Sequence, residues 1–163
     1  MLGGGISNEG VIFNLLEYIK MDGYVLPDLK LTVYTPKNEN KKEERTLHDV
    51  LAEGPKIIFK FSQYGCSSCI IEQIEHLKIL EQEKGYRNII LITDRIPADI
   101  ARCLRAAKVH FQIFLVDEAD LLHEYDKSLI PYVFRTEGIR IVNSMVLSRE
   151  TLEYSRYFYE QFN

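Results

Sequence analysis

The sequence predicts an α/β domain in which helices flank a central mixed β-sheet. Two short apolar runs, "KIIFKFS" at 56–62 and "NIILIT" at 88–93, are typical of buried strands. Between them the apolar residues follow helical spacing until Gly85. A strand, a helix and a second strand in this order predict a β-α-β unit with parallel strands. The 163 residues are enough to bury one core, so we expect one compact domain over 23–163.

The N-terminal part predicts an extension of this domain. Residues 1–22 are interpreted as a leader or a cloning remnant that contains a short helix, which Gly23 can end. The alternating "LKLTVYT" at 29–35 predicts an additional strand, and the charged run at 36–45 predicts a solvated hairpin loop. Thr46 is placed to cap a brief helix that follows it.

The C-terminal half continues the alternation of strands and helices. Pro97 opens a predicted helix whose apolar face includes Cys103. The run at 111–116 predicts a further strand, and 118–128 predicts a short helix or loop. Three more elements are expected: strands at 131–137 and 139–147, which meet at Glu137-Gly138, and a final helix capped by Ser148.

Charge and hydropathy exclude several classes of partner. The formal net charge of -4 argues against a nucleic-acid or anionic-membrane surface, because those partners reward clustered Lys and Arg. No segment approaches the run of about 18 apolar residues that a membrane span needs, and the first residues do not resemble a signal peptide. A signal or membrane anchor beyond the residues of this sequence is left open.

Two of the three cysteines, Cys66 and Cys69, stand where a buried strand turns into a helix. Amide groups and the helix dipole at a helix N-terminus favour a thiolate at the first cysteine. The second lies nearly one turn away, close enough to resolve a mixed disulfide, so the pair predicts a reversible redox switch. The alternatives are half of a zinc site or two small core residues. A zinc site needs two more ligands, which Cys103 alone cannot supply, so no metal and no organic cofactor is expected.

Two segments carry a family resemblance. "KIIFKFSQYGCSSCIIE" at 56–72 resembles the active-site segment of the thioredoxin-like superfamily, and "LIPYVFRTEGIRI" at 129–141 resembles its second conserved region. The strand at 29–35 and the "TLHDVLAEGP" that precedes 56–62 resemble the TlpA/ResA branch of extracytoplasmic thiol-disulfide oxidoreductases.

The resemblance implies a thioredoxin-like fold and a site. Cys66 would attack, Cys69 would resolve, and Pro131 would shape the groove in which a substrate strand pairs. In the superfamily this proline follows a cis bond, so a cis Ile130-Pro131 bond is expected. The implied activity is exchange of disulfides with protein partners, one of which regenerates the pair. The implied location is the periplasm or cell envelope.

The sequence departs from the superfamily at two positions near the cysteines. Gly65 stands where Trp is common, and Tyr64 is a candidate substitute in substrate docking. Lys60 stands where thioredoxins have a buried acid. We interpret its stem as lining the sheet while its amine reaches water, with stabilisation of a thiolate as the alternative.

A carboxylate follows the cysteine pair on the same helix. Glu72 lies three residues after Cys69, an offset at which TlpA/ResA-like proteins often carry a carboxylate, so it is a candidate proton shuttle for that thiol. The alternative is a solvated residue on the helix face, with His76 as its i+4 partner.

Three rival functions remain at this point. A thiol peroxidase carries Thr and Pro shortly before its cysteine, and "FSQYGC" has neither. A binding module would hold Cu(I) between the two thiolates. An idle domain of the same fold would serve as a protein-interaction scaffold. The sequence does not name the substrate, the direction of electron flow or the oligomeric state.

Overall fold

The computed structural model describes residues 21–36, 42–117, 121, 126–148 and 155–162. In these residues the strands form one mixed sheet in the order β2-β1-β5-β4-β3-β6-β7. The strands are β1 (Lys30–Val33), β2 (Glu44–Thr46), β3 (Ile57–Phe61), β4 (Ile89–Thr93), β5 (Gln112–Leu115), β6 (Tyr132–Glu137) and β7 (Arg140–Val146). The described helices are α2 (Leu47–Leu51), α3 (Ser67–Gln82), α4 (Ala98–Ala107) and α6 (Ser155–Glu160).

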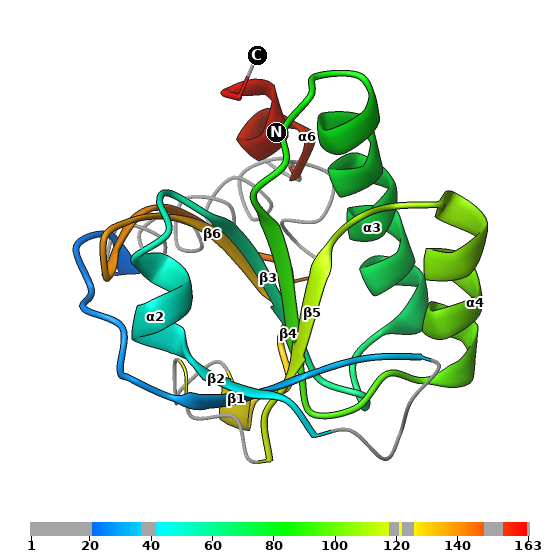
Figure 1. Cartoon of the computed structure of the whole chain (residues 1–163). Coiled ribbons are helices and arrows are strands. Elements are labelled where there is room, and N and C mark those ends of the chain that lie inside the picture. Colours follow the sequence, from blue (N-terminus) through cyan, green and yellow to red (C-terminus); the bar gives the residue numbers. More distant parts are fainter. Residues whose placement is uncertain (1–20, 37–41, 118–120, 122–125, 149–154, 163) are drawn as a thin grey trace.

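The centre of the sheet is parallel and its margins are antiparallel. Strands β3, β4 and β5 run parallel, whereas β6 pairs antiparallel with β3, and β1 pairs antiparallel with β5. Helices α3 and α4 lie side by side on one side of the sheet, α2 lies on the other, and α6 packs near one end of α3 (Figure 1). Every residue of β3 and β4 is buried, as expected for strands covered on both faces. The predicted α/β architecture is confirmed.

The N-terminal extension is a hairpin, and one prediction within it is wrong. Glu44 and Arg45 were expected in a solvated loop, but they belong to β2, which pairs antiparallel with β1. The charges conceal the strand because β2 is the edge of the sheet, where charged side chains face water. Lys30 on β1 forms an ion pair of 3.1 Å with Glu44. Thr46 caps α2 as predicted, since its hydroxyl accepts a hydrogen bond from the Asp49 amide at 3.3 Å.

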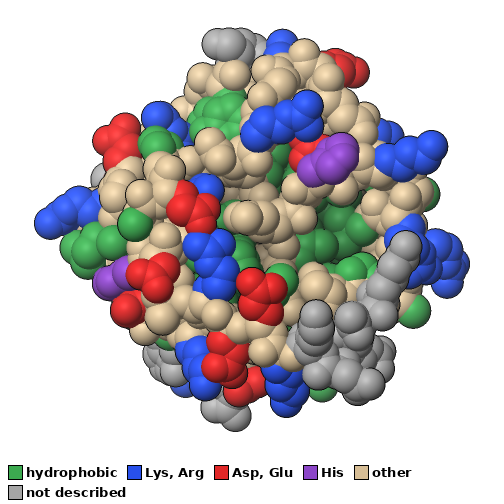
Figure 2. Space-filling view, in the orientation of Figure 1, with side chains coloured by type: hydrophobic (Ala, Val, Ile, Leu, Met, Phe, Trp, Pro, Cys, Tyr) green, Lys and Arg blue, Asp and Glu red, His purple; other side chains and the backbone are tan. Residues whose placement is uncertain are grey.

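Several predicted features lie outside the described residues. They are the helix within 1–22, most of the helix or loop at 118–128, and the chain immediately after Ser148. The final helix is present as α6. In the described part of the chain, no helix is long and apolar enough to cross a membrane. On the face shown in Figure 2, acidic and basic side chains are interspersed rather than gathered by sign.

Candidate redox site

A tight turn carries the chain from β3 into α3. The Gly65 amide donates to the Ser62 carbonyl at 2.9 Å, and the Tyr64 amide donates to the Ser62 hydroxyl at 3.2 Å. These bonds turn the chain directly after a fully buried strand, so the next residue, Cys66, lies beyond the C-terminal end of β3. Tyr64 is 73% exposed beside it.

The two predicted cysteines meet at the start of α3. Cys66 and Cys69 form a disulfide, with their Cα atoms 5.2 Å apart. Cys66 is the N-cap of the helix, and its Sγ accepts a hydrogen bond from the Cys69 amide at 3.3 Å. The Ser68 hydroxyl lies 3.3 Å from the same sulfur. Cys66 is exposed and Cys69 is half-buried, so an incoming thiol reaches the first sulfur more easily.

Gly65 is explained by close approach of the Ser62 backbone. A Cβ at this position would lie 3.2 Å from the Ser62 carbonyl oxygen and 3.4 Å from Ile70 Cδ1. It would also lie 3.7 Å from the Leu129 carbonyl oxygen, which belongs to the segment before β6. A bulky side chain such as Trp therefore has no room to begin here without moving the turn.

An acid that the sequence analysis did not single out anchors the other side of the turn. Asp94 follows β4, and its carboxylate accepts from the Gln63 amide at 2.8 Å and from the Gln63 side-chain amide at 2.9 Å. Partial burial alone would raise the pKa of Asp94, but the hydrogen bonds from Gln63 and Thr93 outweigh it and lower that pKa. Its place directly after a buried strand that neighbours β3 was the available sequence signal.

Pro131 lies where the resemblance places it, but not in the expected isomer. It is buried immediately before β6, whose first residue Tyr132 pairs with Lys60 of β3. The described residues contain no cis peptide bond, so the expected cis Ile130-Pro131 bond is wrong. In this structure the chain instead turns at Leu129, whose φ of 59° is left-handed, and the ordinary trans bond then leads into β6.

The interpretation of Lys60 as reaching water is also wrong. Its Nζ lies 3.2 Å from Asp126 Oδ1, and the two side chains are 4% and 7% exposed. The Tyr132 hydroxyl donates to the same Asp126 oxygen at 2.8 Å. A buried ammonium requires a partner, and here the partner comes from a segment 66 residues further along the chain, which sequence spacing does not indicate.

Glu72 and His76 lie on α3 beyond the cysteines. Glu72 is exposed three residues after Cys69. His76 is half-buried and stacks on Tyr159 of α6, with ring centroids 5.0 Å apart. Burial lowers the pKa of His76, and the negative charge of Glu72 opposes that effect. The negative charge of Glu75 opposes it as well, so Glu72 is not singled out as the partner of His76.

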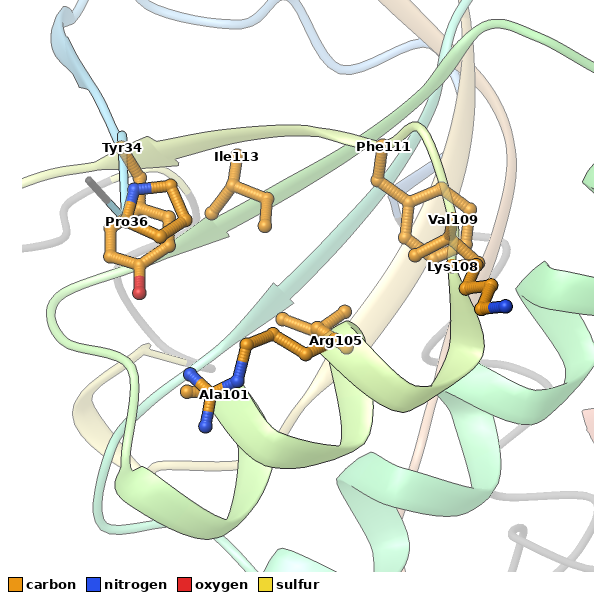
Figure 3. Close-up of a pocket in the computed structure, with 9 residues that line it drawn as sticks. Tyr34, Pro36, Ala101, Arg105, Lys108, Val109, Phe111 and Ile113 are labelled. Atoms are coloured by element: carbon orange, nitrogen blue, oxygen red, sulfur yellow. The ribbon is translucent and has the colours of Figure 1, made fainter.

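The other candidate features lie apart from the disulfide. Cys103 of α4 is partly buried against the core, as predicted, and burial raises the pKa of its thiol. A cavity of about 290 Å³ lies between α4 and the strands β1 and β5, with Tyr34, Arg105 and Phe111 among its lining residues (Figure 3). None of the predicted site residues lines it. Among the described residues, no cluster of His, Cys, Asp and Glu is arranged to hold a metal ion.

Comparison with known proteins identifies the fold. The sequence matches no protein-family model and no curated protein. The structure is similar to peroxidoxin BcpB from Mycobacterium tuberculosis, with a TM-score of 0.58 and 11% identity over 86% of this chain and 96% of that one. It is also similar to a thiol:disulfide interchange protein from Bacteroides sp., with a TM-score of 0.53 and 17% identity over 85% of this chain and 90% of that one. The fold is thioredoxin-like.

The same thioredoxin-like fold is shared with peroxiredoxin 5 from Alvinella pompejana, at a TM-score of 0.57 and 15% identity over 86% of this chain and 97% of that one. Proteins named for disulfide interchange and proteins named as peroxiredoxins therefore both share it. A fold hosts several chemistries, so the function has to be argued from the cysteine pair and its surroundings.

Proposed function

We propose that the protein is a thiol-disulfide oxidoreductase that exchanges disulfides with protein partners through Cys66 and Cys69. The observation that carries the proposal is the pair itself. Its two sulfurs are joined at the N-terminus of α3, with the first exposed and the second half-buried. This asymmetry assigns the attacking role to Cys66 and the resolving role to Cys69.

The exchange moves two electrons between the pair and a partner. In the reduced protein, the Cys66 thiolate attacks a partner disulfide, a mixed disulfide forms, and one partner sulfur leaves as a thiolate. The Cys69 thiolate then attacks Cys66 Sγ, the mixed disulfide breaks, and the second partner sulfur leaves. The partner gains two electrons and takes up two protons as its thiolates become thiols, and Cys66–Cys69 is oxidised. Every step is reversible, so a partner dithiol returns the pair to the reduced state by the opposite sequence.

The surroundings of Cys66 support its role as the attacking sulfur. The Cys69 amide and the Ser68 hydroxyl both lie within 3.3 Å of its Sγ and can donate to a thiolate there. The positive end of the α3 dipole acts in the same direction. Pro131 is proposed to shape the groove in which a partner strand pairs, and the exposed side chains of Tyr64 and Leu129 offer an apolar surface to a partner chain. Glu72 is proposed to exchange protons with Cys69.

The test is reduction of a disulfide-linked protein, such as insulin, by the dithiothreitol-reduced protein. We expect turnover by the wild type and none by Cys66→Ser. Cys69→Ser should accumulate the mixed disulfide, which mass spectrometry of the alkylated sample detects. Cys103→Ser is the matched control, because this third thiol is partly buried on α4 and should leave turnover unchanged.

Hydrogen peroxide as the oxidant separates this proposal from its rival. Oxidation of the reduced pair by peroxide that is faster than its oxidation by insulin would overturn disulfide exchange in favour of a thiol peroxidase. Wild-type protein that never forms or opens the Cys66–Cys69 disulfide would overturn the proposed disulfide exchange. Stoichiometric Cu(I) binding without exchange activity would instead indicate a metal-binding module.

The location outside the cytoplasm, in the periplasm or cell envelope, is proposed from the resemblance to the TlpA/ResA branch. Fractionation of cells that express the natural gene tests it directly. Recovery of the protein with the cytoplasmic fraction would contradict this part of the proposal.

A further inference from the structure

A buried ion pair joins β3 to the segment that leads into β6. Lys60 Nζ and Asp126 Oδ1 are 3.2 Å apart, and both side chains are almost fully buried. The side chain of Tyr132, which is completely buried, donates its hydroxyl to the same carboxylate at 2.8 Å. Two buried charges are costly to remove from water, and breaking the pair would leave an uncompensated buried charge. The mechanism proposed above does not use this cluster of Lys60, Asp126 and Tyr132.

The cluster closes the 126–132 segment on itself. Asp126 begins the segment and Tyr132 ends it, so the bond between their side chains spans the whole turn. Within the segment, the Leu129 amide donates to the Asp126 carbonyl at 3.1 Å. The other Asp126 oxygen, Oδ2, accepts from the Leu121 amide at 2.9 Å. The position of the Leu129 carbonyl beside Gly65 therefore depends on where Asp126 is held.

The cluster also reaches the strand that leads into the cysteines. Lys60 is the penultimate residue of β3, and Ser62, two residues later, fixes the turn that delivers Cys66. Lys60 thus lies on the strand that leads into the cysteine turn, whereas Asp126 and Tyr132 lie at the two ends of the 126–132 segment. The ion pair joins β3, which leads into the cysteine turn, to the 126–132 segment, whose Leu129 carbonyl lies near Gly65.

We propose that Lys60, Asp126 and Tyr132 form a positioning cluster that holds the 126–132 segment against the cysteine turn and so stabilises the disulfide over the dithiol. A disulfide requires both sulfurs at bonding distance, whereas the reduced thiols tolerate a looser turn. A frame that already holds the turn raises the effective concentration of one thiol at the other. The cluster acts through the backbone, and none of its groups takes part in the exchange.

The equilibrium with glutathione measures this effect directly. The reduced protein and one oxidised glutathione give the Cys66–Cys69 disulfide and two reduced glutathiones, so electrons and protons balance without a protein partner. The wild type, Tyr132→Phe and Asp126→Asn would be equilibrated over a range of glutathione ratios, alkylated and analysed by mass spectrometry. Tyr132→Phe keeps the ion pair and guards against the unfolding that an unpaired Lys60 can cause.

The matched control is Glu81→Gln. Glu81 is also a buried carboxylate with several hydrogen bonds, from the amide and ring of His110, but it lies near the far end of α3. We expect the equilibrium constant for disulfide formation to fall about threefold in Tyr132→Phe, or about 14 mV at roughly 30 mV per decade, and further in Asp126→Asn. Glu81→Gln should leave the constant unchanged even where it lowers stability.

A second readout separates positioning from general support of the fold. The free energy of unfolding would be measured for the oxidised and the reduced form of each variant. A positioning role requires the oxidised form to lose more stability than the reduced form, by the free energy that corresponds to the shift in equilibrium. Equal losses in both forms, with an unchanged glutathione equilibrium, would overturn the proposal.

The biological meaning of this inference rests on the proposed function. Its test does not, because the glutathione equilibrium needs no protein partner. A glutathione equilibrium that responds to the cluster, together with no reduction of insulin, would refute the proposed exchange with protein partners and still support the positioning cluster. A glutathione equilibrium constant that is unchanged in the cluster variants, together with normal insulin reduction, would refute only the positioning role of the cluster.

Discussion

Replacement of Asp94 by Asn tests whether the β4 carboxylate anchors the turn before the cysteines. The carboxylate accepts two hydrogen bonds from Gln63, at 2.8 and 2.9 Å, through different oxygens. Asn offers only one acceptor oxygen, so its NH₂ group must face one of the two Gln63 donors. The surviving bond also loses its charge assistance.

The expected loss is moderate because Asp94 is only partly buried. A hydrogen bond to a charged group contributes about 1.5–3 kcal/mol, and water can partly replace it at this site, so we expect Asp94→Asn to cost about 1–2 kcal/mol at pH 7. Asp117→Asn, on an exposed acid, removes the same charge without a comparable anchor. That control should change the free energy of unfolding by less than about 0.5 kcal/mol.

The loss should depend on pH in a defined direction. The hydrogen bonds from Gln63 lower the pKa of Asp94 in the folded state below its value in the unfolded chain. The stabilisation is therefore fully present above the unfolded pKa of about 3.9 and disappears as the pH falls through the folded value. Guanidinium denaturation of wild type and Asp94→Asn at pH 7 and at successively lower pH measures the difference. A difference that is absent at pH 7, or that grows on acidification, would refute the reasoning.

Three further predictions concern the cysteine turn and α3. Gly65→Ala should destabilise the oxidised protein by about 1–2 kcal/mol in denaturant, because the added methyl group meets a backbone carbonyl; unchanged stability would show that the turn yields freely. Ser68→Ala should slow iodoacetamide alkylation of the attacking thiol near pH 7 about twofold or more, since it removes a donor to the sulfur, whereas Ser67→Ala should not. Glu72→Gln should slow insulin reduction at neutral pH and alter its pH profile, with Glu75→Gln as the exposed control; equal effects of the two would remove the proton-shuttle role.

The sequence was informative wherever the physics is local. Hydrophobic periodicity located β3, α3 and β4, because a buried strand and an amphipathic helix each repeat over a few residues. The Cys66–Cys69 spacing at the start of a helix indicated the redox pair for the same reason. Hydrophobic periodicity failed to indicate β2, because a charged edge strand has the composition of a loop.

Only the tertiary structure shows the contacts between segments that lie far apart in the chain. The partner of Lys60 is Asp126, and the anchor of Gln63 is Asp94. Pro131 directly precedes β6, which pairs with β3, and the cis bond that the resemblance implies before it is absent. The sequence alone determined most of the elements and the place of the Cys66–Cys69 pair at the start of α3. The position of the 126–132 segment relative to the cysteine turn depends on packing across the sheet, and no local pattern encodes that packing.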